Sequence, residues 1–136
     1  MDSKEVLKEY FGYDSFRAGQ EDIINAILAK KDVLAIMPTG AGKSLCYQVP
    51  AMMLSGITVV ISPLISLMQD QVKSLNDVGI NAAYVNSTLS ESEIDGTLNM
   101  ALNGIYKIIY IAPERLESAK FCEFSRQADI SMVTVD

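Results

Sequence analysis

The sequence contains no histidine, only two cysteines and no long apolar run. Without histidine, catalysis by an imidazole base is excluded and a zinc site is disfavoured. Cys46 and Cys122 are too few and too far apart for a disulfide framework or a metal knuckle, so we expect buried thiols in a reducing cytoplasm. No apolar run reaches the roughly 18 residues of a membrane span, so we expect no membrane partner.

Basic residues are also scarce, with 11 Lys and Arg against 17 Asp and Glu and a net charge of −6. Taken alone, this balance argues against a nucleic-acid binder, whose footprint is usually basic. Binding needs a local groove rather than a basic average, however. Hydrophobic residues make up 49% of the 136 residues, enough to fill the core of one domain or part of one. The N-terminus lacks a signal-peptide layout, and we expect a cytoplasmic location, nucleoid-associated if bacterial.

Five apolar runs predict strands, and the segments between them predict helices. We expect strands at 33–37, 58–62, 82–85, 106–112 and 131–135, and helices at 3–10, 19–29, 43–54, 64–78 and 90–102. Ser90 and Glu93 form a capping-box pattern, and Pro50 should kink or shorten its helix. The alternation predicts an α/β fold with a doubly wound parallel sheet and right-handed crossovers.

The most informative stretch runs from Met37 to Ser44 and reads Met-Pro-Thr-Gly-Ala-Gly-Lys-Ser. A strand, a glycine-bearing loop ending in Gly-Lys-Ser and a helix form a P-loop, which binds a nucleoside triphosphate. Gly40 and Gly42 let backbone N–H groups converge on phosphate oxygens, Lys43 can reach the β- and γ-phosphates, and Ser44 can ligate Mg²⁺. The strict pattern has glycine at the position of Met37. The alternative is a glycine turn followed by a chance Lys-Ser.

A second segment, 11–21, precedes the P-loop and reads Phe-Gly-Tyr-Asp-Ser-Phe-Arg-Ala-Gly-Gln-Glu. A glutamine amide can pair with the N6 and N7 edge of adenine, which makes Gln20 a candidate for base recognition. The Arg17 plane or the Tyr13 ring can stack on the base. The alternative is a helix N-terminus with a hydrophobic staple.

These motifs and two others resemble those of RecQ-family DNA helicases, which are ATP-dependent superfamily 2 enzymes. Residues 11–20 resemble motif 0 of that family, and 37–48 resemble motif I. Val-Val-Ile-Ser-Pro-Leu-Ile-Ser-Leu-Met-Gln-Asp-Gln at 59–71 resembles motif Ia, and Tyr-Ile-Ala-Pro-Glu-Arg-Leu at 110–116 resembles motif Ib. Departures are small: Ala18 stands where the family often has proline, and Ala41 where it often has glycine.

The resemblance implies a P-loop NTPase fold of the RecA-like type and assigns roles to its motifs. The residues that would hold ATP, with Mg²⁺, are Tyr13, Arg17, Gln20, Thr39, Gly40, Ala41, Gly42, Lys43 and Ser44. The residues that would contact single-stranded DNA are Ser62, Pro63, Pro113, Glu114 and Arg115. The latter follow two strands, where open α/β sheets bind ligands. The prolines can also simply end strands, and Asn86 and Ser87 can either contact DNA or begin a turn.

Residues 132–136 form an apolar strand that ends in Asp136, the layout of a Walker B strand whose Asp holds Mg²⁺ through water. Lys43 and Asp136 are therefore the catalytic candidates. In RecQ-like helicases the motif continues as Asp-Glu-Ala-His. We expect residues 1–136 to be a partial N-terminal RecA-like helicase ATP-binding domain, truncated at the Walker B Asp and inactive alone. The strand that lies between the P-loop and Walker B strands in such folds would follow residue 136, which predicts a gap near the middle of the sheet.

The resemblance thus implies the ATP-binding segment of a 3′-to-5′ ATP-dependent DNA helicase active in repair or recombination. Its cofactors would be ATP and Mg²⁺, and its partners single-stranded and duplex DNA and a second RecA-like domain of the parent chain. Another superfamily 2 ATPase, such as an RNA helicase, and a non-catalytic nucleotide- or DNA-binding module are the alternatives. A generic P-loop kinase would not explain motifs 0, Ia and Ib.

Overall fold

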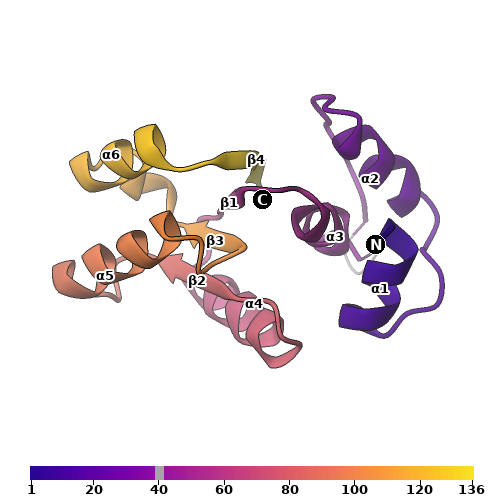
Figure 1. Ribbon diagram of the computed structural model, residues 1–136, viewed down its shortest axis with the longest axis horizontal. Helices are drawn as coiled ribbons and strands as arrows, with labels where there is room; N and C mark the ends of the chain where they lie inside the picture. Colours follow the sequence, from indigo (N-terminus) through magenta and orange to yellow (C-terminus); the bar gives the residue numbers. More distant parts are fainter. Residues whose placement is uncertain (39–41) are drawn as a thin grey trace. The chain divides into compact units, whose positions relative to one another are not determined.

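The computed structural model describes residues 1–38 and 42–136, which form two compact units, Met1–Ser55 and Gly56–Asp136 (Figure 1). The first unit contains helices α1 (Ser3–Phe11), α2 (Gln20–Leu28) and α3 (Leu45–Met53). Their core contains Val6, Leu7, Ile24 and Val49, all buried. All three helices were predicted from the sequence, within two residues at each end. Helix α3 continues past Pro50 and ends at Met53, and its residues from Cys46 to Ala51 are all buried.

The predicted strand at 33–37 is wrong, because residues 31–38 have no regular secondary structure. Leu34 and Ile36 are each 90% exposed, whereas a parallel strand covered on both faces would bury them. A strand is held by hydrogen bonds to a neighbouring strand. The four strands of the described sheet pair only with one another, so this apolar run has no ladder partner.

The second unit is built on a four-stranded parallel sheet. Its strands are β1 (Ile57–Ile61), β2 (Ala82–Val85), β3 (Ile108–Ile111) and β4 (Ile130–Val135), in the order β2-β3-β1-β4. All four were predicted, and the structure confirms the α/β fold with a parallel sheet. Strand β4 lies at an edge, and in the described part of the chain nothing pairs with its outer side. The predicted gap near the middle of the sheet is wrong for the described residues, because their four strands form one continuous sheet that ends at β4.

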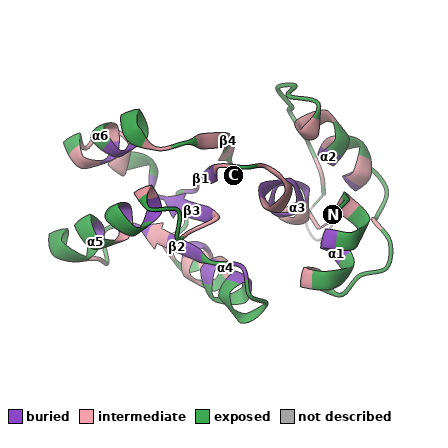
Figure 2. Ribbon diagram, in the orientation of Figure 1, coloured by how far each residue is buried: buried purple, intermediate pink, exposed green. Residues whose placement is uncertain are grey.

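Helices cover both faces of this sheet. Alternate residues of a strand point to opposite faces. On one face, apolar strand residues such as Val59 and Ile109 pack with helices α5 (Glu91–Leu102) and α6 (Ala119–Gln127) through Leu98 and Phe124. Helix α4 (Ile65–Asp77) contacts β2 and β3 and buries Met68, Val72 and Leu75. Figure 2 shows β1 and β3 mostly buried, whereas β4 has no buried residue.

The sequence missed two elements between β3 and β4, namely the short 3₁₀ helix η1 (Pro113–Arg115) and helix α6. The capping box of α5 was predicted correctly, since the Ser90 side chain accepts from the Glu93 amide and the Glu93 side chain accepts from the Ser90 amide. None of the helices in the described ranges is both long and apolar enough to cross a lipid bilayer.

Candidate functional site

The P-loop leads directly into helix α3 in the first unit. Gly42 has a positive φ of 75°, a conformation that favours glycine. Its carbonyl accepts from the Leu45 amide at 3.2 Å, and the carbonyl of Lys43 accepts from the Cys46 amide at 3.1 Å. Lys43 is exposed and Ser44 half-buried at the start of the helix, where backbone amides and the helix dipole favour an anion. Predicted residues Thr39, Gly40 and Ala41 lie outside the described residues.

Gln20, predicted to contact adenine, binds the backbone on both sides of its amide. Its Nε2 donates to the Gly42 carbonyl at 3.0 Å, and its Oε1 accepts from the Arg17 amide at 2.7 Å. The side chain is 1% exposed. A Cβ at position 42 would clash with Gln20 Nε2, so any other residue there would have to displace the Gln20 amide. The structure therefore brings Arg17, Gln20 and Gly42 together and joins the second sequence motif to the P-loop.

Tyr13 lies in the link between α1 and α2 and is 51% exposed, and the Arg17 residue is exposed as well. A solvent-exposed ring and guanidinium are suited to stacking on a nucleotide base, as the sequence predicted. Their assignment to adenine stays a prediction.

Met37, which replaces the glycine of the strict P-loop pattern, contacts the first turn of α3. Its Sδ lies 3.7 Å from the Sγ of Cys46. The Cys46 residue is buried, and burial raises the pKa of its thiol. A protonated, buried thiol is a structural group rather than a nucleophile, as the sequence predicted.

The predicted DNA-contacting residues of the second unit lie together at the carboxyl ends of the parallel strands. The parallel register places Ile61 beside both Ile111 and Val135, and Ile111 beside Val85. Hydrogen bonds continue one residue further: the amide of Ser62 donates to Ile111 at 3.1 Å, that of Ala112 to Val85 at 3.1 Å, and that of Asp136 to Ile61 at 2.9 Å. The segments that follow all four strands therefore start from the same end of the sheet, the end at which the strands finish.

These residues differ in what they present to a ligand. Ser62 is 2% exposed, and its Oγ accepts from the Leu64 amide at 3.4 Å, while Pro63 is exposed. Pro113 and Glu114 are exposed and begin η1, which Arg115 ends. Pro63, Pro113 and Glu114 are thus accessible to solvent, whereas the Ser62 side chain is not.

Asn86 stabilises a turn, which is one of the two roles that the sequence allowed for it. Its side chain is fully buried, and its Oδ1 accepts from the amide of Thr88 at 2.9 Å. A side chain in this position holds the turn, which favours the turn alternative, and a DNA contact by Asn86 stays a prediction. Ser87, beside it, is exposed.

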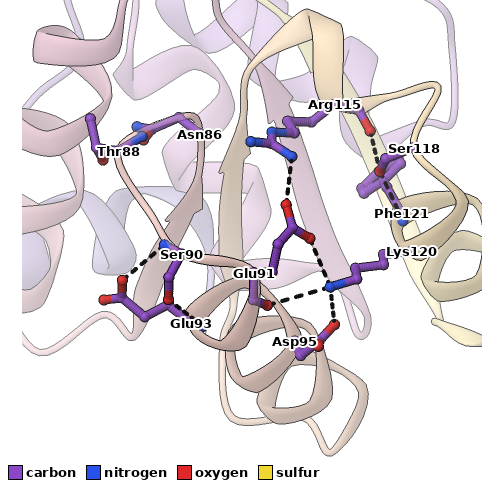
Figure 3. A network of polar contacts seen from close by, with 10 residues as sticks. All are labelled: Asn86, Thr88, Ser90, Glu91, Glu93, Asp95, Arg115, Ser118, Lys120 and Phe121. Atoms are coloured by element: carbon purple, nitrogen blue, oxygen red, sulfur yellow. Dashed lines mark hydrogen bonds and ion pairs between the residues drawn. The ribbon is translucent and has the colours of Figure 1, made fainter.

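Arg115 belongs to a network of ion pairs that the sequence did not predict (Figure 3). Glu91, the first residue of α5, places Oε1 3.6 Å from an Arg115 guanidinium nitrogen and Oε2 2.8 Å from Lys120 Nζ. Lys120 also pairs with Asp95 at 3.0 Å. The hydrogen bond from Lys120 lowers the pKa of Glu91, and the one to Glu91 raises the pKa of Lys120. The only sequence signal was the capping box, which fixes Glu91 in the first turn of α5.

Residues 17–136 match the family model described as DEAD/DEAH box helicase. The matched range includes Arg17, Gln20, the P-loop, the prolines that follow β1 and β3, and Asp136. Tyr13 lies outside it. The chain belongs to the DEAD/DEAH box helicase family. In a DEAD/DEAH box helicase domain the P-loop is a site of ATP use.

Several relatives of this DEAD/DEAH box helicase chain bear the names of DNA helicases. The chain is 50% identical over 135 residues to "ATP-dependent DNA helicase RecQ" of Bacillus subtilis, covering 98% of this chain and 23% of that protein. It is 47% identical to the RecQ protein of Pasteurella multocida, covering 97% and 21%, and 45% identical to the yeast "ATP-dependent helicase SGS1", covering 86% and 8%. The chain thus spans about a quarter or less of each of these proteins.

Among solved structures, the DUF1998 helicase MrfA bound to DNA and AMPPNP has a TM-score of 0.78 at 17% identity, covering 100% of this chain and 20% of that one. The same helicase bound to DNA has a TM-score of 0.74 at 19% identity, covering 98% and 20%. At this level of identity the likeness shows a shared fold, and it agrees with the RecA-like fold expected of a DEAD/DEAH box helicase.

Proposed function

We propose that this chain is the ATP-binding segment of a 3′-to-5′ ATP-dependent DNA helicase, which couples ATP hydrolysis to translocation on single-stranded DNA and to duplex unwinding in repair or recombination. The observation that carries the proposal is the alignment of strand ends in the second unit. Ser62-Pro63, Pro113–Arg115 and Asp136 start from one sheet edge, the edge at which open α/β sheets bind ligands. The identity to RecQ proteins supports the choice of DNA.

In this proposal the first unit binds the nucleotide. The N-terminal end of α3 and Lys43 would hold the phosphates, and Tyr13 and Arg17 would stack on adenine. Gln20 is buried and bonded through both amide atoms to Gly42 and Arg17, so it would act on the nucleotide through the positions of these two residues. The bond to Gly42 would make base binding and the shape of the phosphate loop depend on each other.

Ser44 would ligate Mg²⁺ beside the phosphates, since magnesium is commonly bound by one or two protein oxygens together with phosphate oxygens and waters. Asp136, in the second unit, stays the Walker B candidate that the resemblance implies. The ion would neutralise charge that develops on the phosphates.

The rest of the cycle would depend on parts of the protein outside these residues. The chain covers 23% of the length of the Bacillus relative. We place in that remainder the second RecA-like domain, which would close on ATP and open after hydrolysis. We also place the working protein in the cytoplasm, associated with the nucleoid if the source is bacterial.

The test is ATP hydrolysis by the full-length protein that carries these residues, with and without single-stranded DNA. We expect DNA to stimulate hydrolysis, and Lys43→Ala and Asp136→Asn each to remove it, since loss of such groups costs several orders of magnitude in rate. Lys31→Ala, at another exposed lysine, is the matched control and should retain activity. Stimulation by RNA in place of DNA would favour the RNA helicase alternative. Nucleotide binding without turnover would favour a non-catalytic module.

A further inference from the structure

The network around Arg115 joins two neighbouring strand ends. Arg115 ends η1, which follows β3, while Glu91 begins α5, which follows β2. Asn86 fixes the turn between β2 and α5, and the Ser90–Glu93 capping box fixes the start of the helix. On the other side, the Arg115 carbonyl accepts from the Ser118 hydroxyl at 2.8 Å. The backbone on both sides is therefore held, and it places the Glu91 carboxylate opposite the Arg115 guanidinium (Figure 3).

The two contacts of the Glu91 carboxylate are unequal. One oxygen lies 2.8 Å from Lys120 Nζ, the distance of a charge-assisted hydrogen bond. The other lies 3.6 Å from a single nitrogen of Arg115, which is too long for a hydrogen bond and makes one loose ion pair rather than a bidentate fork. Lys120 thus orients the carboxylate, and Asp95 at 3.0 Å orients Lys120.

The Arg115 side chain is 25% exposed, so part of it is open to solvent beyond the end of β3. A phosphate is the ligand that a guanidinium binds best, and a carboxylate is its closest competitor in charge and shape. Glu91 is ionised at neutral pH, and its pKa is held below the ordinary value by Lys120. A fixed negative charge therefore stands where a backbone phosphate would approach Arg115.

We propose that Glu91 is an affinity-setting residue that competes with a nucleic-acid phosphate for the Arg115 guanidinium, held in that position by Lys120. The competition lowers the affinity of Arg115 for a phosphate of single-stranded DNA. A weak contact suits a protein that must release and rebind a strand at each step. The proposal rests on the DNA-binding role proposed above for Arg115.

The test is equilibrium binding of a fluorescent single-stranded oligonucleotide to the full-length protein across a range of salt concentrations. Glu91→Gln keeps the shape of the side chain and removes its charge. We expect it to tighten binding about two- to fivefold at low salt, the range for an exposed ion pair. The added phosphate contact should steepen the dependence of log affinity on log salt by about 0.7. A general effect on folding would not steepen this dependence.

Glu93→Gln is the matched control. It removes an equal charge from the same helical turn, glutamine also serves in a capping box, and Glu93 bonds to Ser90 instead of Arg115. This variant should bind like the wild type. In an Arg115→Gln background, Glu91→Gln should have no effect, because the competing guanidinium is gone.

Three results would overturn the proposal: unchanged or weaker binding by Glu91→Gln, equal tightening by Glu93→Gln, or tightening that persists without Arg115. A wild-type protein that binds no single-stranded DNA would instead refute the proposed function, and this proposal with it. If the wild type binds DNA and Glu91→Gln binds it with the same affinity, this proposal alone would be refuted.

Discussion

Gly42→Ala should destabilise the first unit through two separable effects. A residue with a Cβ at a φ of 75° costs about 1–2 kcal/mol. The new Cβ would also clash with Gln20 Nε2, so we expect the amide to move and to lose its bonds to Gly42 and Arg17. At about 0.5–1.5 kcal/mol for each hydrogen bond, this adds about 1–3 kcal/mol.

Gly12→Ala isolates the first effect. Gly12 has the same φ of 75°, and nothing lies within 4 Å of its hypothetical Cβ. Hydrogen exchange of the α2 amides in the full-length protein reports the local opening free energy. We expect Gly42→Ala to lower this energy by about 1–3 kcal/mol more than Gly12→Ala does, because only Gly42→Ala displaces the Gln20 amide.

Gln20→Ala completes a double-mutant cycle, since it removes the amide that the new Cβ would strike. The double variant should be less destabilised than the sum of the two single changes, by about the same 1–3 kcal/mol. Strict additivity, or equal effects of Gly12→Ala and Gly42→Ala, would show that the loop does not depend on Gln20.

Four further predictions concern other parts of the molecule. Thr58→Val should be neutral or stabilise by about 1 kcal/mol in urea unfolding, because the buried Thr58 hydroxyl has no hydrogen-bond partner among the described residues. Phe124→Ala should cost about 3–5 kcal/mol in the same assay, because Phe124 is 2% exposed in the core. Cys46 should react with a thiol reagent at least about tenfold more slowly than Cys122, since burial raises the Cys46 pKa. Because the pKa of Glu91 is lower in the folded protein, ionised Glu91 stabilises the fold at pH values above its ordinary pKa of 4.5. This stabilisation is lost as the pH falls through the lowered pKa. The unfolding free energies of the wild type and Glu91→Gln should therefore converge in acid.

Local signals predicted most of the helices and strands. The capping box at Ser90 and Glu93 and the apolar run at β1 each correspond to an element in the structure. Helix α6 was missed although Ser118 caps it and Phe121 and Phe124 keep helical spacing. Apart from Ala119 and Cys122, its remaining residues are polar, which weakened the apolar periodicity on which the prediction relied.

The error at 33–37 has a different origin. Composition favours a strand there, but a strand exists only beside a partner, and a partner far along the chain leaves no local trace. The same limit applies to the site. The motif that contains Gln20 was found from the sequence, whereas its bond to Gly42 and the pairing of Glu91 with Arg115 join residues that are distant in sequence.

The position of β1 between β3 and β4 has a consequence for synthesis. Strand β1 begins at Ile57, and its two partners begin roughly 50 and 70 residues later, at Ile108 and Ile130. At about 5–20 residues per second, a ribosome takes about 3–10 s to make the first partner. During that time the segment Ile-Thr-Val-Val-Ile, uncharged and prone to form strands, has no partner in the nascent chain. We expect this interval to be the point at which the emerging protein depends most on a chaperone.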